Sequence, residues 1–250
     1  LPGAEALAAA AAQLVLRNQP CNVIAIVGPH ASGKTSLIGG IYDLFQHGPV
    51  GGFSFAGSST LHAFERACHD SRAASKREEP HMERTQTGDA TYFHIDVVES
   101  TCTTKRAALF ANRAGEDYMD AQSDPNLAKG FAELMRCDTL TILADGKKLL
   151  DIGARHQVRE DVCQTLRAFE EAGLTRTWQQ LALVLTKIDA IRQDTENADR
   201  AIRHFDSIVE DVRTQFSRHF MDIRLFRVAA SPKEEGTERG EGMATLLTYW

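Results

Sequence analysis

The chain has 250 residues, of which 43% are hydrophobic and 25% charged, and its net charge at pH 7 is −6. These values are typical of a globular protein with a full hydrophobic core, and the absence of a basic field argues against a nucleic-acid-binding protein. The five cysteines are odd in number and lack a CxxC spacing, which argues against a disulfide framework and a zinc knuckle and predicts a reducing, cytoplasmic setting.

An alanine-rich stretch at the start of the chain predicts a helix over residues 4–16. It is too short to span a bilayer, and it lacks the basic segment of a signal peptide. The chain begins at Leu1 rather than at Met, which suggests a piece of a longer protein.

The hydrophobic pattern predicts an alternation of strands and helices. The glycine-rich stretch 48–57 is interpreted as irregular and the polar stretch 75–89 as a mobile loop, while the turn at 100–105 predicts an antiparallel hairpin. Strands are expected over 22–27, 91–98, 107–111, 139–144, 181–185 and 223–228, and helices over 34–45, 58–74, 127–136, 158–172, 198–219 and 243–250.

This alternation predicts an α/β fold with a mostly parallel sheet, one antiparallel edge strand and helices on both faces. No linker divides the chain, so we expect a single domain over 1–250. Residues 1–20 would be an N-terminal helical extension, and residues 48–90 an insertion.

A phosphate-binding loop is predicted between the first strand and the helix that follows it. Residues 28–35 read GPHASGKT and match GxxxxGK[ST] at every required position. Backbone amides of such a loop bind phosphate oxygens, the lysine reaches the β- and γ-phosphates, and the hydroxyl after it binds Mg²⁺. We therefore expect nucleotide contacts from Gly28, His30, Ala31, Ser32, Gly33, Lys34, Thr35 and Ser36, with Thr35 as a Mg²⁺ ligand.

A second motif indicates which base is bound. The apolar strand 181–185 runs directly into Thr186-Lys187-Ile188-Asp189, which resembles the [NT]KxD motif of GTPases. A carboxylate pairs with the N1–H and N2–H₂ donors of guanine, which adenine lacks. The strand 223–228 is followed by Ala229-Ala230, which resembles the loop that binds the guanine carbonyl through a backbone amide.

The switch regions depart from the usual pattern. Asn112-Arg113-Ala114-Gly115 occupies the place of DxxG, so an amide replaces the aspartate that holds a Mg²⁺-bound water. Gly115 matches the glycine whose amide contacts the γ-phosphate, and Glu116 takes the place of a water-orienting glutamine. With Lys34, these two form the expected catalytic set.

Two positions in the expected metal site have alternatives. Asp145 could replace the missing carboxylate, although the start of an Asp-Gly turn is the better interpretation. The switch I threonine that completes the Mg²⁺ site is Thr85 or Thr87, with Thr85 preferred.

Taken together, these motifs resemble the translation-factor-related (TRAFAC) P-loop GTPases, with a Ras-like fold. Residues 56–69, Arg84-Thr85 and Ala114-Gly115-Glu116 resemble more specifically the bacterial double-GTPases of conflict and defence systems, and the resemblance covers roughly residues 22–250. It implies a cytoplasmic switch that binds GTP or GDP with Mg²⁺ and works with protein partners, such as a second GTPase or an effector of the same system. Because Asn112 replaces the aspartate, we expect slow hydrolysis.

Two other functions remain as alternatives. A P-loop ATPase or kinase-like phosphotransferase would share the phosphate loop, but the TKID motif argues against it. A scaffold that binds nucleotide without hydrolysing it would fit Asn112.

Overall fold

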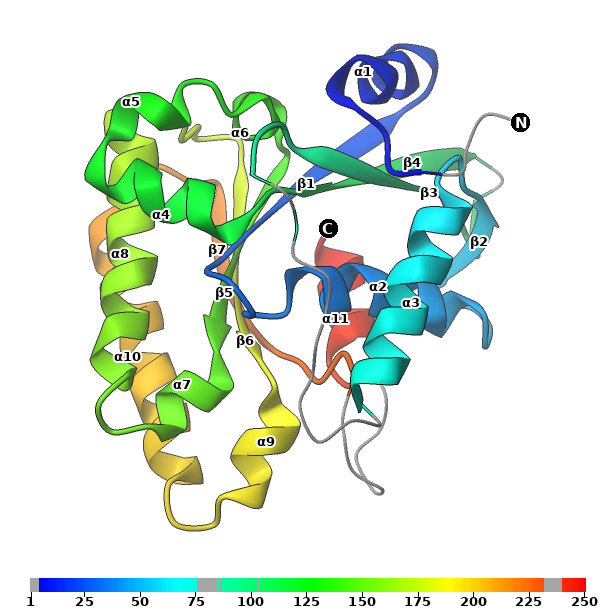
Figure 1. The fold of residues 1–250 in the computed structure, drawn as a ribbon. Helices are drawn as coiled ribbons and strands as arrows, with labels where there is room; N and C mark the ends of the chain where they lie inside the picture. The colour runs from blue at the N-terminus through cyan, green and yellow to red at the C-terminus, as the bar shows by residue number, and fades with distance from the viewer. Residues whose placement is uncertain (1–4, 76–84, 86, 103, 232–239) are drawn as a thin grey trace.

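The computed structural model describes residues 5–75, 85, 87–102, 104–231 and 240–250, which form a seven-stranded sheet with helices on both faces (Figure 1). The strand order is β2-β3-β4-β1-β5-β6-β7. The last five of these are parallel, β3 is antiparallel to β4, and β2 is antiparallel to β3. The strands are β1 (Cys21–Val27), β2 (Phe53–Gly57), β3 (Thr91–Glu99), β4 (Lys105–Asn112), β5 (Thr139–Asp145), β6 (Gln180–Thr186) and β7 (Asp222–Arg227).

The central strands β1, β5 and β6 are mostly apolar because both of their faces are covered. In β1, Val23, Ala25 and Val27 pack into the core on one face of the sheet, while Ile24 and Ile26 pack into the core on the other. Each residue of this strand from Val23 onward is at most 2% exposed. This firmly held strand leads directly into the predicted phosphate loop.

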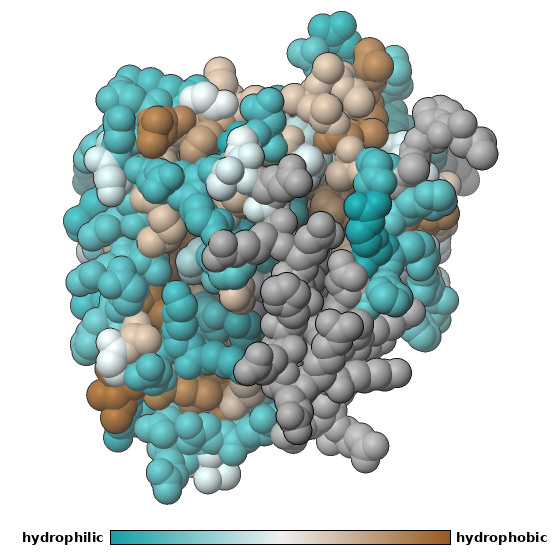
Figure 2. Space-filling view, in the orientation of Figure 1, coloured by the Kyte–Doolittle hydropathy of each residue, from teal (hydrophilic) through white to brown (hydrophobic). Residues whose placement is uncertain are grey.

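The helices form two layers. Helices α4 to α10 cover one face of the sheet, and α2, α3 and α11 cover the other (Figure 1). The outer surface of the first layer is mostly hydrophilic, with isolated hydrophobic patches (Figure 2). The helices are α1 (Ala9–Asn18), α2 (Lys34–Phe45), α3 (Leu61–Ser75), α4 (Gly115–Ser123), α5 (Pro125–Ala128), α6 (Ala132–Arg136), α7 (Gly146–Leu150), α8 (Arg155–Glu171), α9 (Ile188–Gln193), α10 (Ala198–Phe216) and α11 (Met243–Tyr249).

The predicted fold class is confirmed, including the antiparallel hairpin, which is β3 and β4. Three short helices that follow strand ends, α4, α7 and α9, were not predicted. The helix expected over 127–136 is two helices, because Phe131 has a non-helical backbone and Gly130 closes a turn onto Leu127. The helix expected over 4–16 begins later, at Ala9, because Leu7 pairs with Tyr92 at the edge of β3.

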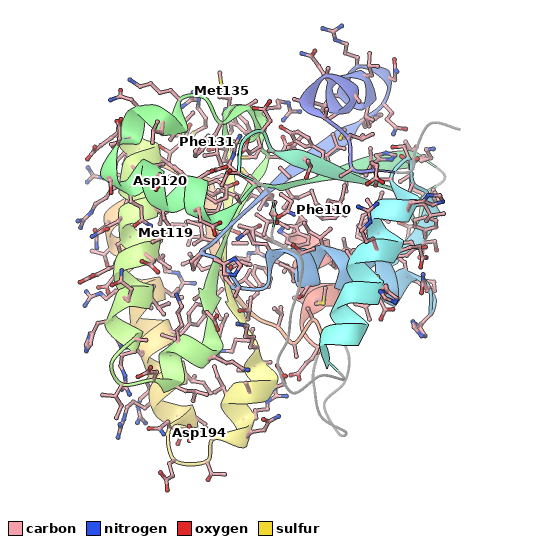
Figure 3. The ribbon with its side chains drawn as sticks, in the orientation of Figure 1. Phe110, Met119, Asp120, Phe131, Met135 and Asp194 are labelled. Atoms are coloured by element: carbon pink, nitrogen blue, oxygen red, sulfur yellow. The ribbon has the colours of Figure 1, made fainter. Side chains whose placement is uncertain are left out.

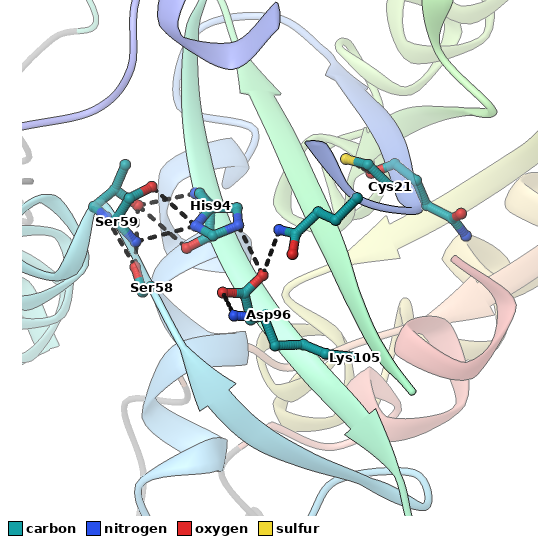
Figure 4. A network of polar contacts seen from close by, with 9 residues as sticks. Cys21, Ser58, Ser59, His94, Asp96 and Lys105 are labelled. Atoms are coloured by element: carbon teal, nitrogen blue, oxygen red, sulfur yellow. Dashed lines mark hydrogen bonds and ion pairs between the residues drawn. The ribbon is translucent and has the colours of Figure 1, made fainter. Parts of the chain in front are cut away.

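Strand β2 lies within the stretch that was predicted to be irregular, and it forms the edge of the sheet beyond β3. A buried polar network fastens the following loop to β3 (Figure 4). The Ser59 amide and hydroxyl lie 3.0 and 2.9 Å from His94 Nδ1, and His94 Nε2 lies 3.1 Å from Asp96 Oδ1. Burial lowers the pKa of His94, which favours a neutral ring. Nδ1 accepts from the Ser59 amide, so the ring proton lies on Nε2. Because Nδ1 already accepts the Ser59 amide, we interpret this Ser-His-Asp arrangement as structural.

Most of the loop expected over 75–89 lies outside the described residues. Within the described part of the chain, the helices are too short or too polar to cross a membrane.

Candidate functional site

The predicted phosphate loop joins β1 to α2 in the conformation that its glycines allow. Gly33 has φ +100°, and Ala31 also lies in the left-handed region at φ +60°. A Cβ on Gly28 would lie 2.6 Å from the Ser32 hydroxyl, so a larger residue there would crowd the loop. The backbone amides of His30, Ala31 and Gly33 donate no hydrogen bond to any described residue. These amides are therefore available to an anion at the start of α2.

Lys34 is buried beneath this loop. Its side chain is folded back so that Nζ donates to the carbonyl oxygens of Gly28 at 2.7 Å and Pro29 at 3.0 Å. Burial lowers the pKa of Lys34 to about 8, and the charge of Glu116 opposes that shift. An ammonium group that is desolvated and held by two neutral carbonyls is well suited to receive an anionic phosphate.

The TKID motif lies directly against the phosphate loop, although the two are more than 150 residues apart in sequence. Thr186 Oγ1 donates to the Ser32 carbonyl at 2.9 Å, and Lys187 Nζ donates to the Ala31 carbonyl at 2.8 Å. Asp189 is 9% exposed and lies in the first turn of α9. The two motifs are therefore parts of one site.

The loop after β7 is also tied to this motif. The Val228 carbonyl accepts the Ile188 amide at 3.2 Å, which places the loop beside α9. The Ala229 amide donates to the Glu241 carbonyl at 3.1 Å. Of the two alanines expected to contact the base, Ala230 is the one whose amide donates to no described residue.

Asn112 ends β4 opposite Ile26 of β1, beside the phosphate loop. Its Nδ2 lies 3.5 Å from Thr85 Oγ1, whereas Thr87 is exposed. Its Oδ1 is buried and has no hydrogen-bond partner among the described residues. The structure therefore brings together Asn112 and the preferred switch I threonine, with a buried oxygen left for a further donor such as a metal-bound water.

Gly115 and Glu116, at the start of α4, lie against the phosphate loop. A Cβ on Gly115 would come within 2.5 Å of the His30 amide nitrogen and 2.6 Å of the Pro29 carbonyl carbon, so only glycine fits without a backbone shift. Glu116 Oε1 lies 3.9 Å from His30 Nδ1. The expected catalytic residues are thus adjacent to the loop.

Asp145 is engaged elsewhere. Its Oδ1 accepts the Lys147 amide at 2.9 Å at the start of α7, and its Oδ2 pairs with Lys187 Nζ at 2.7 Å. This supports the turn interpretation and gives Asp145 the further task of orienting Lys187.

Sequence reasoning missed the buried residues around Arg113, which pairs with Glu133 and lies near Asp117 and Gly88. An arginine between Asn112 and Gly115 was visible in the sequence, but its partners were not. Nothing in the spacing points to a carboxylate on α6.

Nearly the whole chain matches one known protein family. The family model for Double-GTPase 2 matches residues 22–250. No curated protein matches the sequence significantly.

Among solved structures, the chain is similar to the signal recognition particle receptor SRb-GTP/SRX complex from Chaetomium thermophilum, with 12% identity, a TM-score of 0.45, and coverage of 90% of this chain and 95% of that one. It is also similar to the Ski7 GTPase-like domain of S. cerevisiae bound to GDP and inorganic phosphate, with 10% identity, a TM-score of 0.49, and coverage of 96% and 51%. A structure of sup35 complexed with GDP matches with 15% identity, a TM-score of 0.40, and coverage of 86% and 38%.

The family match covers nearly the whole chain, including the phosphate loop, the switch residues and the TKID motif. The chain therefore belongs to the Double-GTPase 2 family and is a GTP-binding protein.

Proposed function

We propose that this protein binds GTP or GDP with Mg²⁺ and hydrolyses GTP slowly, as a switch. The observation that carries the proposal is the direct contact of Thr186 and Lys187 with the carbonyls of Ser32 and Ala31. This contact ties the base motif to the phosphate loop. A nucleotide bound there would have its base beside α9 and its phosphates at the start of α2.

Guanine would be recognised by three groups. The Asp189 carboxylate would accept the N1–H and N2–H₂ donors, and the Ala230 amide would donate to the guanine carbonyl. The aliphatic part of Lys187, held by Asp145 and Ala31, would lie along the base plane. An adenine base would leave the buried carboxylate unpaired.

The residues around Asn112 fit a magnesium ion. Hydroxyl oxygens are suitable Mg²⁺ ligands, and this ion keeps several of its waters. Thr35 and Thr85 would supply the hydroxyls, and the buried Asn112 Oδ1 would accept a hydrogen bond from a metal-bound water. The bound ion would neutralise phosphate charge.

Hydrolysis would depend on Glu116, Gly115 and Lys34. The Gly115 amide would donate to the γ-phosphate, Lys34 would offset its charge, and Glu116 would orient the attacking water. A carboxylate beside the γ-phosphate is repelled by it. With a neutral Asn112 as well, we propose an intrinsic rate near the ~10⁻⁴ s⁻¹ of unassisted small GTPases.

The test compares binding of GTP, GDP and ATP with Mg²⁺ by calorimetry, followed by single-turnover hydrolysis. We expect GTP and GDP to bind more tightly than ATP by roughly a hundredfold or more. Equal binding of ATP would favour the ATPase alternative. Tight GTP binding without any turnover would favour the non-hydrolysing scaffold.

Asn112→Asp tests the departure in the switch region. The carboxylate would hold the metal-bound water more firmly, so GTP binding should become more dependent on Mg²⁺ and single-turnover hydrolysis should become faster. Titrating Mg²⁺ against a fixed GTP concentration measures the first effect. A variant with the parent's Mg²⁺ dependence and rate would show that Asn112 does not limit turnover.

The cellular setting is proposed from the sequence resemblance alone. We propose a cytoplasmic component of a bacterial conflict or defence system that works with a protein partner, such as a second GTPase or an effector. We also propose that residues 1–250 form a single nucleotide-binding domain, with 1–20 as an extension and 48–90 containing switch I. Ala12 of α1 packs into the same hydrophobic core as helices α4 to α10, which supports a single domain.

A further inference from the structure

Arg113 lies between Asn112 and Gly115 and is only 5% exposed. Its Nε and Nη2 donate to the two carboxylate oxygens of Glu133 on α6, at 2.6 and 3.1 Å. Its guanidinium carbon lies 4.1 Å from the centre of the Phe131 ring. Phe131 lies close to α4 (Figure 3). Tyr118 of α4 also donates to Glu133. These contacts hold the guanidinium group in a fixed orientation.

The remaining guanidinium nitrogen of Arg113 faces the segment that follows Thr85. Nη1 donates to the Gly88 carbonyl and lies 3.4 Å from Asp117 Oδ2. The same Asp117 oxygen accepts the Gly88 amide at 3.2 Å. Both backbone polar groups of Gly88 are therefore bound by side chains from the switch II region.

The residues on either side of Gly88 lie at the surface of the protein. Thr87, Gly88 and Asp89 are all exposed, so little packing holds them. Gly88 has φ +123°, a conformation that restricts which residue can occupy this turn. Thr85 precedes it by three residues, a distance of at most about 11 Å along an extended chain. Fixing Gly88 therefore limits how far the Thr85 hydroxyl can lie from Asn112.

We propose that Arg113 and Asp117 are positioning residues that bind Gly88 and thereby keep Thr85 near the phosphate site before nucleotide binds. This inference rests on the proposed function, because it assumes that Thr85 helps to hold the metal and γ-phosphate. Both residues act through the Gly88 backbone. Loss of these contacts should therefore weaken the binding of GTP but not of GDP. GTP binding would use switch I, whereas GDP lacks the γ-phosphate that switch I would contact.

Asp117→Ala is the better variant for a test, because Arg113 would keep its Glu133 pairing and the core would stay intact. The matched control is Asp120→Ala, an exposed carboxylate on the same helix (Figure 3). The measurements are the affinities for GDP and for a non-hydrolysable GTP analogue, both with Mg²⁺, and amide hydrogen exchange at residues 87–89 in the nucleotide-free protein. Thermal unfolding of each variant reports on the fold.

We expect Asp117→Ala to weaken binding of the GTP analogue by about tenfold, the worth of one charge-assisted hydrogen bond. GDP affinity should stay within about twofold of the parent, exchange at 87–89 should be faster, and Asp120→Ala should match the parent. An Asp117→Ala variant with unchanged exchange, or with equal losses for both nucleotides, would overturn the inference. If the parent itself binds neither nucleotide, the proposed function fails instead.

Arg113→Lys provides a second measurement. Lysine keeps a charge for Glu133 but cannot form the paired contact and also reach Gly88. We expect the same selective loss of GTP-analogue binding. A variant that unfolds earlier but keeps the parent's ratio of GTP-analogue to GDP affinity would show that Arg113 serves only the fold.

Discussion

Asp189→Asn is expected to change the base preference of this protein from guanine to xanthine. The carboxylate would accept two donors of guanine, whereas an asparagine would present a donor in place of one acceptor. Each lost charge-assisted hydrogen bond is worth about 1.5–3 kcal/mol, so the affinity for GTP should fall by about tenfold to a hundredfold or more. Xanthine carries a carbonyl at C2, which the new amide can bind, so affinity for XTP should rise.

The measurement is a competition between GTP and XTP for each protein, and Asp199→Asn is the matched control. Asp199 is an exposed residue in the first turn of the neighbouring helix α10, so this substitution should change neither affinity. If Asp189→Asn bound GTP as tightly as the parent, Asp189 would not be the guanine ligand. The contacts of Thr186 and Lys187 with the phosphate loop would then be structural only.

The sequence was sufficient where strong local signals coincide with the fold. The predicted bounds of α2, residues 34–45, match the structure, because a left-handed glycine precedes the helix and an apolar face continues through it. The TKID motif was placed at the end of β6 for a similar reason: the apolar run over residues 181–185 ends where polar residues begin. Parallel strands then bring both motifs to the same edge of the sheet.

The sequence was insufficient where contacts are made by residues far apart in the chain. Strand β2 contains Ser54 and Gly57, which do not form a typical strand pattern, and its pairing with β3 and the network around His94 hold it in place. The role of Asp145 became clear only from its contact with Lys187, 42 residues later. The pairing of Arg113 with Glu133 likewise depends on how α6 packs, which periodicity cannot give.

Lys34→Met is expected to have opposite effects on nucleotide binding and on the stability of the nucleotide-free protein. The ammonium group would contact the β- and γ-phosphates, and two charge-assisted contacts are worth about 3 kcal/mol or more, a factor of about 150 in affinity. Methionine has a similar length and is well suited to the buried space. Binding of both GTP and GDP should therefore be lost at concentrations that saturate the parent.

The stability of the nucleotide-free protein should not fall in Lys34→Met, because folding lowers the pKa of Lys34 to about 8. The pKa of lysine in an unfolded chain is about 10.4. The charged form is thus disfavoured in the folded state, and this cost is fully present at pH 7 and disappears as the pH rises from about 8 to about 10.4. Removing the charge at pH 7 should leave the nucleotide-free protein at least as stable as the parent, despite the loss of the hydrogen bonds to Gly28 and Pro29.

Thermal unfolding at pH 7, with and without GTP and Mg²⁺, measures both effects in one experiment. The parent should gain stability with nucleotide by mass action, whereas Lys34→Met should gain none. Lys129→Met, which removes an exposed lysine of the α5 region, should behave as the parent does. If Lys34→Met were destabilised without nucleotide and still stabilised by GTP, Lys34 would be a structural residue that holds the Gly28 and Pro29 carbonyls rather than a phosphate ligand.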